Sequence, residues 1–287
     1  MSNTATVLAF DFGASSGRAI RAVYDGQNLT YEEIHRFENI PIEKDGHLCW
    51  NVETLLKEIH TAIQKAGTFD SLGFDTWGVD FGLLDADGHL LANPVHYRDA
   101  RTNGKPEQAA ARMPAEELYA HTGNQIMAIN TLFQLLALQE QEPELLQKAE
   151  QVLFMPDLFA ALLGAEPVCE RSIASTSQML DPRTGQWSRK VLAAYGLPEN
   201  CFAPIVASGT VTGTLANGAK IIAVAGHDTQ CASVAMPCAE EDAEHTAFLS
   251  CGTWSLLGTE LDAPILTADS CQSGLSNELG ANGKINY

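Results

Sequence analysis

The sequence has few basic residues for its length. Its 287 residues include 17 lysines and arginines against 36 aspartates and glutamates, which gives a formal net charge of −19. An acidic surface of this kind repels nucleic-acid phosphates and anionic lipid headgroups, so we expect neither nucleic acid nor a membrane as a partner. A small phosphate-bearing ligand is not excluded, because local backbone amides and a metal ion can hold it.

The chain also lacks long hydrophobic runs and paired cysteine motifs. No stretch approaches the roughly 18 consecutive apolar residues of a membrane-spanning helix, and the N-terminus has no basic flank typical of a signal peptide. Seven cysteines occur without a C-x-x-C pair, which favours reduced thiols over a disulfide framework or a zinc site. We therefore expect a cytoplasmic protein, and nothing in the sequence indicates its oligomeric state.

Hydrophobic residues make up 45% of the chain and charged residues 18%, a balance typical of a globular protein with a sizeable core. Near the N-terminus, short apolar runs predict strands at residues 7–10, 19–24 and 29–37, with a turn at Asp25-Gly26. Helical spacing of apolar residues predicts a helix over 51–66, capped by Asn51 and ended by Gly67. The chain therefore begins with a run of strands.

The rest of the chain is expected to be richer in helices. The further predicted strands and helices are a strand at 71–74, a hairpin of 79–83 with 90–97 around Asp87-Gly88, mostly helical 105–148 with breaks near Pro114 and Gly123, strands at 152–155, 221–225 and 248–249, and helices at 157–163 and 187–195. Turn residues between 205 and 222 predict a domain boundary. We expect one unit at 1–215 and the start of a second at 216–287.

A glycine- and serine-rich turn follows the first predicted strand, at residues 11–18 (DFGASSGR). Such a turn lets backbone amides and hydroxyls approach phosphate oxygens, and Asp11 is a ligand type that Mg²⁺ prefers. The spacing and the lysine of a P-loop are absent. An ordinary tight hairpin remains the alternative.

A second carboxylate follows the strand at 221–225, in the segment Gly226-His227-Asp228-Thr229. As a general base, Asp228 would accept the proton of a substrate hydroxyl that attacks phosphorus. The alternative is that Asp228 caps the next helix.

Two further segments combine polar and aromatic groups. Residues 75–81 (DTWGVDF) offer Trp77 as a face for stacking on a sugar and Gly78 as space beside it, although the local pattern favours a core tryptophan near a strand end. Residues 97–104 (YRDARTNG) could form hydrogen bonds with the hydroxyl groups of a sugar, or they could form a salt-bridged loop.

These strings, together with a weak internal repeat that aligns 9–16 with 248–255, resemble the FGGY family of carbohydrate kinases in the right order along nearly the whole chain. The resemblance implies an α/β fold with a ribonuclease-H-like ATPase domain of the actin and hexokinase type, a mixed central sheet and the incomplete start of a second such domain. It also implies ATP-dependent phosphorylation of a ketose, L-rhamnulose before fuculose or xylulose, with residues 76–81 as the string that favours L-rhamnulose. A non-catalytic sugar-binding or regulatory module of the same fold is the other reading.

The resemblance also implies roles for individual residues. Asp228 would be the base and Asp11 would serve Mg²⁺. The ketose would contact Gly78, His227, Asp228 and Thr229. The ATP phosphates would be bound by Ala14, Ser15, Ser16, Gly17, Arg18 and Thr253.

The sequence departs from the family pattern at three places. Cys251 stands where a small hydroxyl residue is expected. Leu279 replaces a glycine in the string 277–280 (NELG), which affects the local turn. The remainder of the second domain, which in the family carries most of the adenine pocket, is expected to be missing.

Overall fold

The computed structural model describes residues 4–236, 245–252 and 254–287. Its centre is a six-stranded sheet in the order β13-β14-β6-β1-β2-β3. The strands of this sheet are β1 (Ala5–Phe12), β2 (Ser16–Tyr24), β3 (Leu29–Glu38), β6 (Ser71–Thr76), β13 (Thr210–Thr214) and β14 (Lys220–Ala223). β1, β6 and β14 run parallel, and their outer neighbours are antiparallel. The mixed central sheet is thus confirmed, with β1 inside it.

The side chains of β1 alternate, which explains why it lies at the centre. Leu8, Phe10 and Phe12 are fully buried, whereas Ala9 between them is exposed. The helices α1 (Val52–Ala66) and α6 (Met155–Leu162) contribute to the core on the buried face, where the Phe12 ring stacks on Phe159 of α6 at 4.7 Å. As predicted, the Asn51 side chain caps α1 by accepting from the backbone N–H of Thr54.

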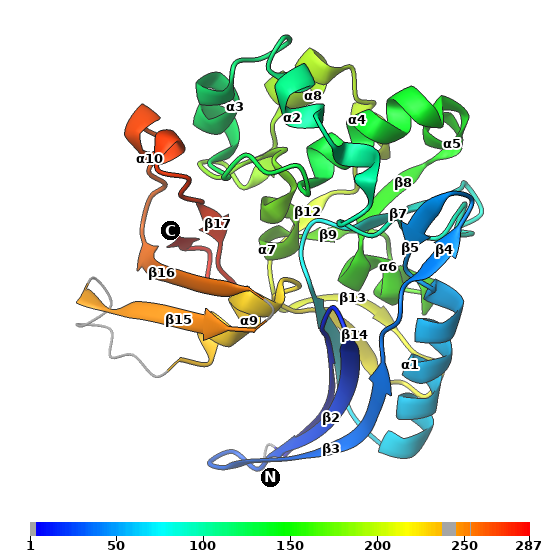
Figure 1. Ribbon diagram of the computed structural model, residues 1–287. Coiled ribbons are helices and arrows are strands. Elements are labelled where there is room, and N and C mark those ends of the chain that lie inside the picture. The colour runs from blue at the N-terminus through cyan, green and yellow to red at the C-terminus, as the bar shows by residue number, and fades with distance from the viewer. Residues whose placement is uncertain (1–3, 237–244, 253) are drawn as a thin grey trace.

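A layer of helices lies beyond the sheet (Figure 1). Its helices are α2 (Lys105–Ala109), α3 (Ala115–Thr122), α4 (Thr131–Gln141), α5 (Pro143–Lys148), α7 (Arg171–Ala174) and α8 (Arg189–Tyr195), with 3₁₀ turns η1 (Ala100–Thr102), η2 (Ser175–Ser177) and η3 (Glu199–Cys201). Short strand pairs connect this layer: β4 (Ile42–Lys44) with β5 (His47–Cys49), β7 (Phe81–Leu84) with β8 (Gln151–Phe154), β9 (Cys169–Glu170) with β12 (Ile205–Val206), and β10 (Leu180–Asp181) with β11 (Gln186–Trp187). The helical breaks expected at Pro114 and Gly123 are confirmed.

The predicted hairpin of residues 79–83 with 90–97 forms only at its turn, where the Leu91 N–H donates to the Leu83 carbonyl at 2.9 Å, and no strand follows over 90–97. The strand that pairs with β7 is β8, and all four residues of β7 are buried. The segment 90–97 forms only single bridges, from Leu90 to Leu84 and from Val95 to Cys49. A strand buried on both faces needs a partner that is also apolar, which β8 supplies, and Pro94 lacks the N–H that a paired strand would use.

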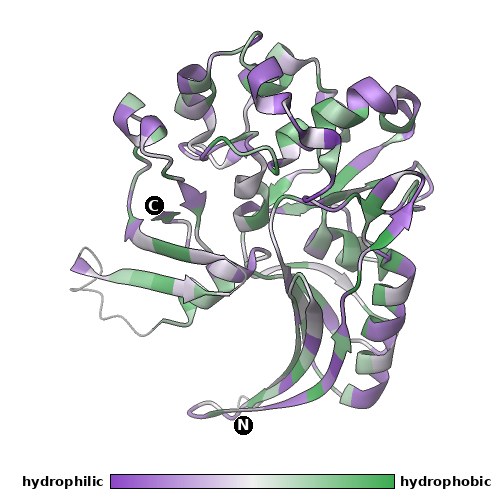
Figure 2. Cartoon of the chain, in the orientation of Figure 1, coloured by the Kyte–Doolittle hydropathy of each residue, from purple (hydrophilic) through white to green (hydrophobic). Residues whose placement is uncertain are grey.

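The C-terminal part forms a second, four-stranded sheet in the order β15-β16-β18-β17. These elements are α9 (Asp228–Val234), β15 (Ala247–Cys251), β16 (Ser255–Leu261), α10 (Ala268–Gln272), β17 (Glu278–Leu279) and β18 (Ile285–Asn286). The β15–β16 hairpin projects from the body and is largely hydrophobic (Figure 2), with Leu249 and Leu257 exposed.

The boundary expected near residue 215 falls between β13 and β14, two paired strands of the first sheet. The first sheet therefore extends to residue 223, and the division at 215 stays a prediction. Among the described residues, none of the helices has the length and apolar character that a membrane crossing requires.

Candidate active site

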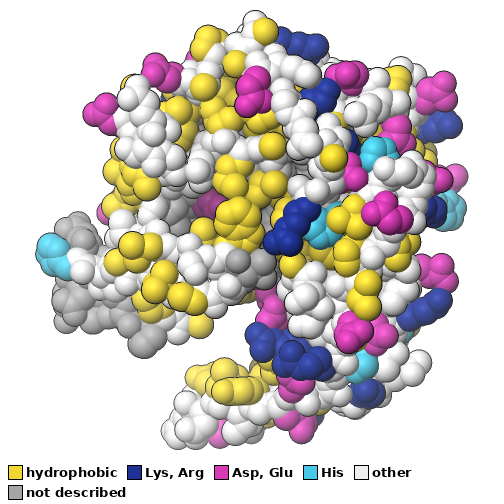
Figure 3. Space-filling view, viewed as in Figure 1, with side chains coloured by type: hydrophobic (Ala, Val, Ile, Leu, Met, Phe, Trp, Pro, Cys, Tyr) yellow, Lys and Arg dark blue, Asp and Glu magenta, His cyan; other side chains and the backbone are white. Residues whose placement is uncertain are grey.

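A cleft of about 570 Å³ lies between the two sheets. Its walls come from the β1–β2 turn, the segment after β6, the turn before α9 and the tip of the β15–β16 hairpin. Figure 3 shows the surface hollowed between the β15–β16 arm and the β1–β3 end of the first sheet. The predicted site residues that line this cleft are Asp11, Ala14, Ser15, Ser16, Arg18, Gly78, His227, Asp228 and Thr229.

Two predicted ATP contacts stand apart from this set. Gly17 is not among the lining residues, and a Cβ atom there would lie 2.2 Å from the ring of Phe37. The Phe37 ring therefore leaves no room for a side chain at position 17, which explains why a glycine stands there. Thr253 lies outside the described residues, although its neighbours Gly252 and Trp254 line the cleft.

The β1–β2 turn is a tight hairpin that opens into the cleft. Asp11 and Arg18 face each other across the two strands, and Arg18 Nε donates to Asp11 Oδ2 at 2.8 Å. The Gly13 N–H donates to the carbonyl of Ser16 at 2.9 Å. Asn39, just after β3, holds the turn from outside because its Nδ2 donates to the Gly13 carbonyl at 3.0 Å. Sequence reasoning missed Asn39, since no local pattern brings it to this turn.

The β15–β16 hairpin repeats this arrangement on the other side of the cleft. Its strands pair antiparallel, and the Gly252 N–H donates to the carbonyl of Trp254 at 2.8 Å. The two segments aligned as an internal repeat in the sequence are therefore two hairpin turns that line the same cleft.

The turn before α9 is fixed to the neighbouring strand. The Gly226 carbonyl accepts from the Thr76 N–H at 2.9 Å, and His227 forms a parallel bridge with Thr76. Asp228 is the first residue of α9, whose N-cap is His227. Asp228 Oδ1 accepts from the Thr229 N–H at 2.6 Å, and the side chain is 43% exposed. Asp228 therefore does not occupy the capping position, and its carboxylate faces the cleft.

A third carboxyl group, in the string 75–81 but given no role from the sequence, lies beside Asp11 and Asp228. Asp75, near the end of β6, is the parallel partner of Asp11. Burial raises the pKa of the Asp75 carboxyl well above its usual range, and the negative charges of Asp11 and Asp228 raise it further. Asp11 and Asp75 thus lie side by side near the ends of two neighbouring parallel strands, and the Asp11 carboxylate offers the kind of oxygen ligand that a hard cation such as Mg²⁺ prefers.

The segment after β6 combines a packed tryptophan with a strained backbone. Trp77 stacks on Trp50 with ring centroids 4.0 Å apart, so it is mainly a core residue with an edge on the cleft. At Gly78 an added Cβ would lie 3.4 Å from His227 Nε2. Val79 has a φ of 65°, which is rare for a β-branched residue. The Thr131 hydroxyl holds it by donating to its carbonyl at 2.6 Å.

The loop at 97–104 is mostly structural. Tyr97 lines the cleft, but Asp99 accepts from the backbone N–H groups of Leu48 and Arg101. Arg101 is buried and donates to Gln134. Of this loop, only Tyr97 lies among the residues that line the cleft.

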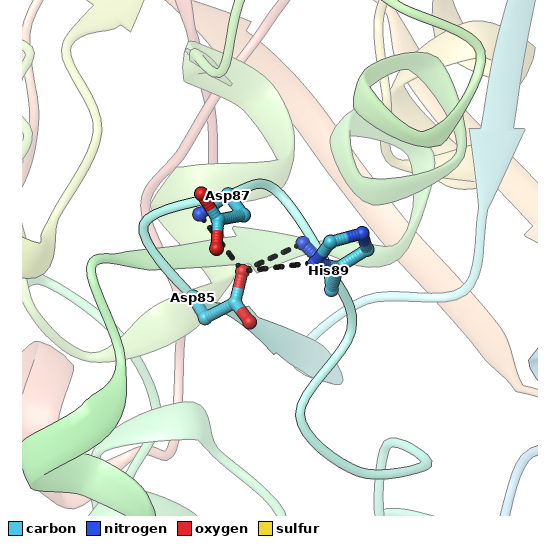
Figure 4. Close-up of side chains that lie close together, drawn as sticks. All are labelled: Asp85, Asp87 and His89. Carbon is cyan, nitrogen blue, oxygen red and sulfur yellow. Dashed lines mark hydrogen bonds and ion pairs between the residues drawn. The ribbon is translucent and has the colours of Figure 1, made fainter.

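One group of possible metal ligands lies away from the cleft. Asp85, Asp87 and His89 converge in the turn after β7 (Figure 4). Asp85 Oδ1 accepts from the backbone N–H groups of Asp87 and His89 at 3.0 and 2.8 Å. Because these bonds close the turn, they explain the convergence without a metal ion.

His227 lies between two carboxylates in the cleft wall. Its Nδ1 lies 2.8 Å from Glu278 Oε2, and its Nε2 lies 3.5 Å from Asp228 Oδ1. Burial opposes protonation, but the carboxylates of Glu278, Asp228 and Asp75 outweigh it and raise the pKa of His227 to about 9. Sequence reasoning missed Glu278, although it lies in the string 277–280 that was singled out.

Comparisons with known proteins agree with this geometry. The chain is 40% identical to a rhamnulokinase of Bacteroides thetaiotaomicron over 97% of its own length, which is 59% of the length of that relative. The solved structure of a gluconate kinase from Lactobacillus acidophilus is similar with a TM-score of 0.82 and 16% identity, over 99% of this chain and 59% of that one. A xylulose kinase from the same organism gives a TM-score of 0.79 and 17% identity, over 98% of this chain and 58% of that one.

The two solved structures establish the fold, with its ribonuclease-H-like first domain, and the chain spans just under three fifths of the length of all three relatives. Residues 6–235 match the N-terminal domain of the FGGY family of carbohydrate kinases, a segment that contains both Asp11 and Asp228. The match covers most of the chain, and the chain therefore belongs to the FGGY family of carbohydrate kinases.

Proposed function

We propose that this chain provides the sugar site and part of the phosphate site of an ATP-dependent ketose kinase, with L-rhamnulose as the substrate and its 1-hydroxyl as the acceptor. The observation that carries the proposal is the position of Asp228 in the same cleft as the β1–β2 turn. The rhamnulokinase relative supports the choice of ketose. The family uses ATP as phosphate donor, and a cytoplasmic location stays an expectation.

In this proposal the cleft has a sugar end and a phosphate end. Gly78, His227 and Thr229 would contact the ketose, and Asp228 would accept the proton of the attacking hydroxyl. The backbone and hydroxyls of residues 14–16, with Arg18 and Thr253, would bind the ATP phosphates. Arg18 would exchange its contact with Asp11 for a phosphate oxygen.

Asp11 would hold Mg²⁺, with Asp75 as a neighbouring carboxylate. When bound, the metal would neutralise charge on the transferring phosphoryl group. The chain's own part is to place the ketose hydroxyl, its base and the phosphate turn at one point, because phosphoryl transfer depends mainly on positioning and charge.

Asp228→Asn tests the base assignment. We expect kcat with MgATP and L-rhamnulose to fall by about 10²–10⁴-fold in the whole protein, because asparagine accepts a proton poorly. Binding of L-rhamnulose by calorimetry and the melting temperature should stay close to those of the unchanged protein, since asparagine keeps the size and one oxygen.

The matched control is Asp269→Asn, in the first turn of α10, a residue that does not line the cleft. An Asp228→Asn variant that keeps a third or more of the original kcat eliminates the base assignment. A panel with L-fuculose and D-xylulose tests the choice of ketose. A protein that binds ketose but never turns over ATP would support the non-catalytic module instead.

A further inference from the structure

Glu278 reaches the cleft from the C-terminal sheet. It lies on β17, pairs with Asn286 of β18, and is followed by Leu279, whose N–H donates to Ser175 Oγ at 3.0 Å. Its carboxylate accepts from His227 Nδ1 and from Gln230 Nε2, both at 2.8 Å. Because the backbone is fixed and the carboxylate has two donors, Glu278 holds one orientation next to His227.

The backbone of His227 is also fixed, by contacts with Thr76 and Ser172. Its backbone bridges Thr76, and its N–H lies 3.4 Å from Ser172 Oγ. With Nδ1 directed at Glu278, Nε2 is turned toward the cleft, beside Gly78 and 3.5 Å from Asp228 Oδ1. The Nε2 atom therefore lies beside the proposed base, Asp228, and beside Gly78, a proposed ketose contact.

The protonation state of His227 decides what Nε2 can do there. A neutral ring that keeps its proton on Nδ1 would offer Nε2 as an acceptor, a second base beside Asp228. An imidazolium offers an N–H donor and accepts no proton. The titratable groups facing His227 in the described structure are Glu278 of β17, Asp228 of α9 and Asp75 of β6, all carboxyl groups.

Resting on the proposed function, we propose that Glu278 is a positioning residue that keeps His227 as an imidazolium with Nε2–H aimed into the cleft. This donor binds a ketose oxygen and leaves Asp228 as the only proton acceptor beside the attacking hydroxyl. Since Glu278 comes from the second sheet, the sugar site of the first unit is complete only when β17 is in place.

The first experiment follows the imidazole of His227 by NMR in the 287-residue chain, labelled on histidine and assigned with the spectrum of His227→Gln. We expect unchanged His227 to lose its proton near pH 9. In Glu278→Gln its midpoint should fall to about 6.5, because the main charge partner is lost while Asp228 and Asp75 still oppose the effect of burial. Glu260→Gln is the matched control, on β16 of the same sheet, where Glu260 contacts Asn282 and Lys284 away from the cleft.

The second experiment measures L-rhamnulose binding by calorimetry at pH 5.5 and pH 8. Glu278→Gln should bind about tenfold more weakly than the unchanged chain at pH 8, the size of one lost charged hydrogen bond. At pH 5.5 its affinity should recover to within about threefold, because the ring is protonated in both proteins. A purely structural role for Glu278 predicts an equal loss at both pH values, and that result would overturn the proposal.

The two experiments separate the inference from the proposed function. If the unchanged chain binds no L-rhamnulose, the choice of ketose fails, and the NMR midpoints still decide the role of Glu278. If Glu278→Gln does not fold, the protonation state of His227 in the unchanged chain, measured by NMR, still tests the proposal. A His227 ring that is already neutral at pH 7 in that chain contradicts the proposal, and a ring protonated at pH 8 supports it.

Discussion

At the scale of single residues, Asp80 shows how a buried charge supports the cleft wall. Its Oδ2 accepts from the indole N–H groups of Trp50 and Trp77 at 2.6 and 3.0 Å, and its Oδ1 accepts from Gln134 Nε2 at 2.8 Å. Burial raises the pKa of Asp80 to about 6, although these donors favour the charged form. The carboxylate thereby fixes Trp77 one residue before Gly78.

We expect Asp80→Asn to lower the free energy of unfolding by roughly 1–3 kcal/mol, because the amide NH₂ group would face donors and leave one of them without an acceptor. The midpoint of urea unfolding measures this. Asp87→Asn is the control, since Asp87 is exposed and should change stability by less than about 0.5 kcal/mol. Equal midpoints for the two variants would contradict the role given to Asp80.

Residues that depend on tertiary contacts were the ones the sequence could not reveal. Asp11 and Asp228 were found because each follows a strand pattern and a glycine lies beside it. Asn39, Asp75 and Glu278 act through partners far along the chain, so the strings 75–81 and 277–280 could be singled out without revealing what Asp75 and Glu278 contact. The left-handed backbone at Val79 was equally hidden, because a β-branched residue normally predicts an extended conformation.

At the scale of elements, the turn before α9 depends on one buried glutamate. Glu170 is the N-cap of α7, where its Oε2 accepts from the Ser172 N–H at 2.9 Å. The same oxygen accepts from the Gly226 N–H at 3.0 Å, and Oε1 accepts from the Ser208 hydroxyl. One carboxylate thus joins α7 to the turn that carries His227 and Asp228.

We expect Glu170→Gln to cost roughly 1–3 kcal/mol of stability and to reduce L-rhamnulose affinity, because an amide cannot accept all these hydrogen bonds and the turn would move. Melting curves and calorimetry measure the two effects. Glu166→Gln, an exposed neighbour, should change neither. If Glu170→Gln lost stability but bound the ketose normally, the link from α7 to the sugar site would be refuted.

Most elements could be predicted because their patterns are local. The alternating burial in β1 and the capped apolar stripe of α1 are both visible within one short stretch of consecutive residues. The hairpin predicted from the turn at Asp87-Gly88 ends after its first contacts, and residues 90–97 do not continue it as a strand. The choice of β8 as the partner of β7 depends on burial on both faces, which is a property of the assembled core.

At the scale of the whole molecule, the His227–Glu278 contact should make stability depend on pH. The pKa of His227 is raised from 6.5 to about 9, so its contribution is fully present below pH 6.5 and is lost as pH rises through 9. The shift corresponds to roughly 3 kcal/mol at most. The pKa of Glu278 is lowered, chiefly because the positive charge of His227 outweighs its burial, so its contribution is lost only toward acid pH.

We therefore expect the urea midpoint to fall between pH 6.5 and pH 9 in the unchanged chain and to fall much less in Glu278→Gln. Subtracting the slope of midpoint against pH in Glu278→Gln from the slope in the unchanged chain cancels the contribution of the other titrating groups. Parallel slopes in the two proteins would show that His227 titrates alike in the folded and unfolded states.

The parallel core of the first sheet has a consequence for how the chain is made. β6 pairs with β1 on one side and with β14 on the other, with Lys220 opposite Ser71. During synthesis, β1, β2, β3 and β6 leave the ribosome early, but the edge of β6 that takes β14 stays open until residue 223 has emerged. Such long-range pairing is slow and leaves apolar strands uncovered meanwhile. A nascent chain of this kind is a natural client for chaperones until its first sheet is closed.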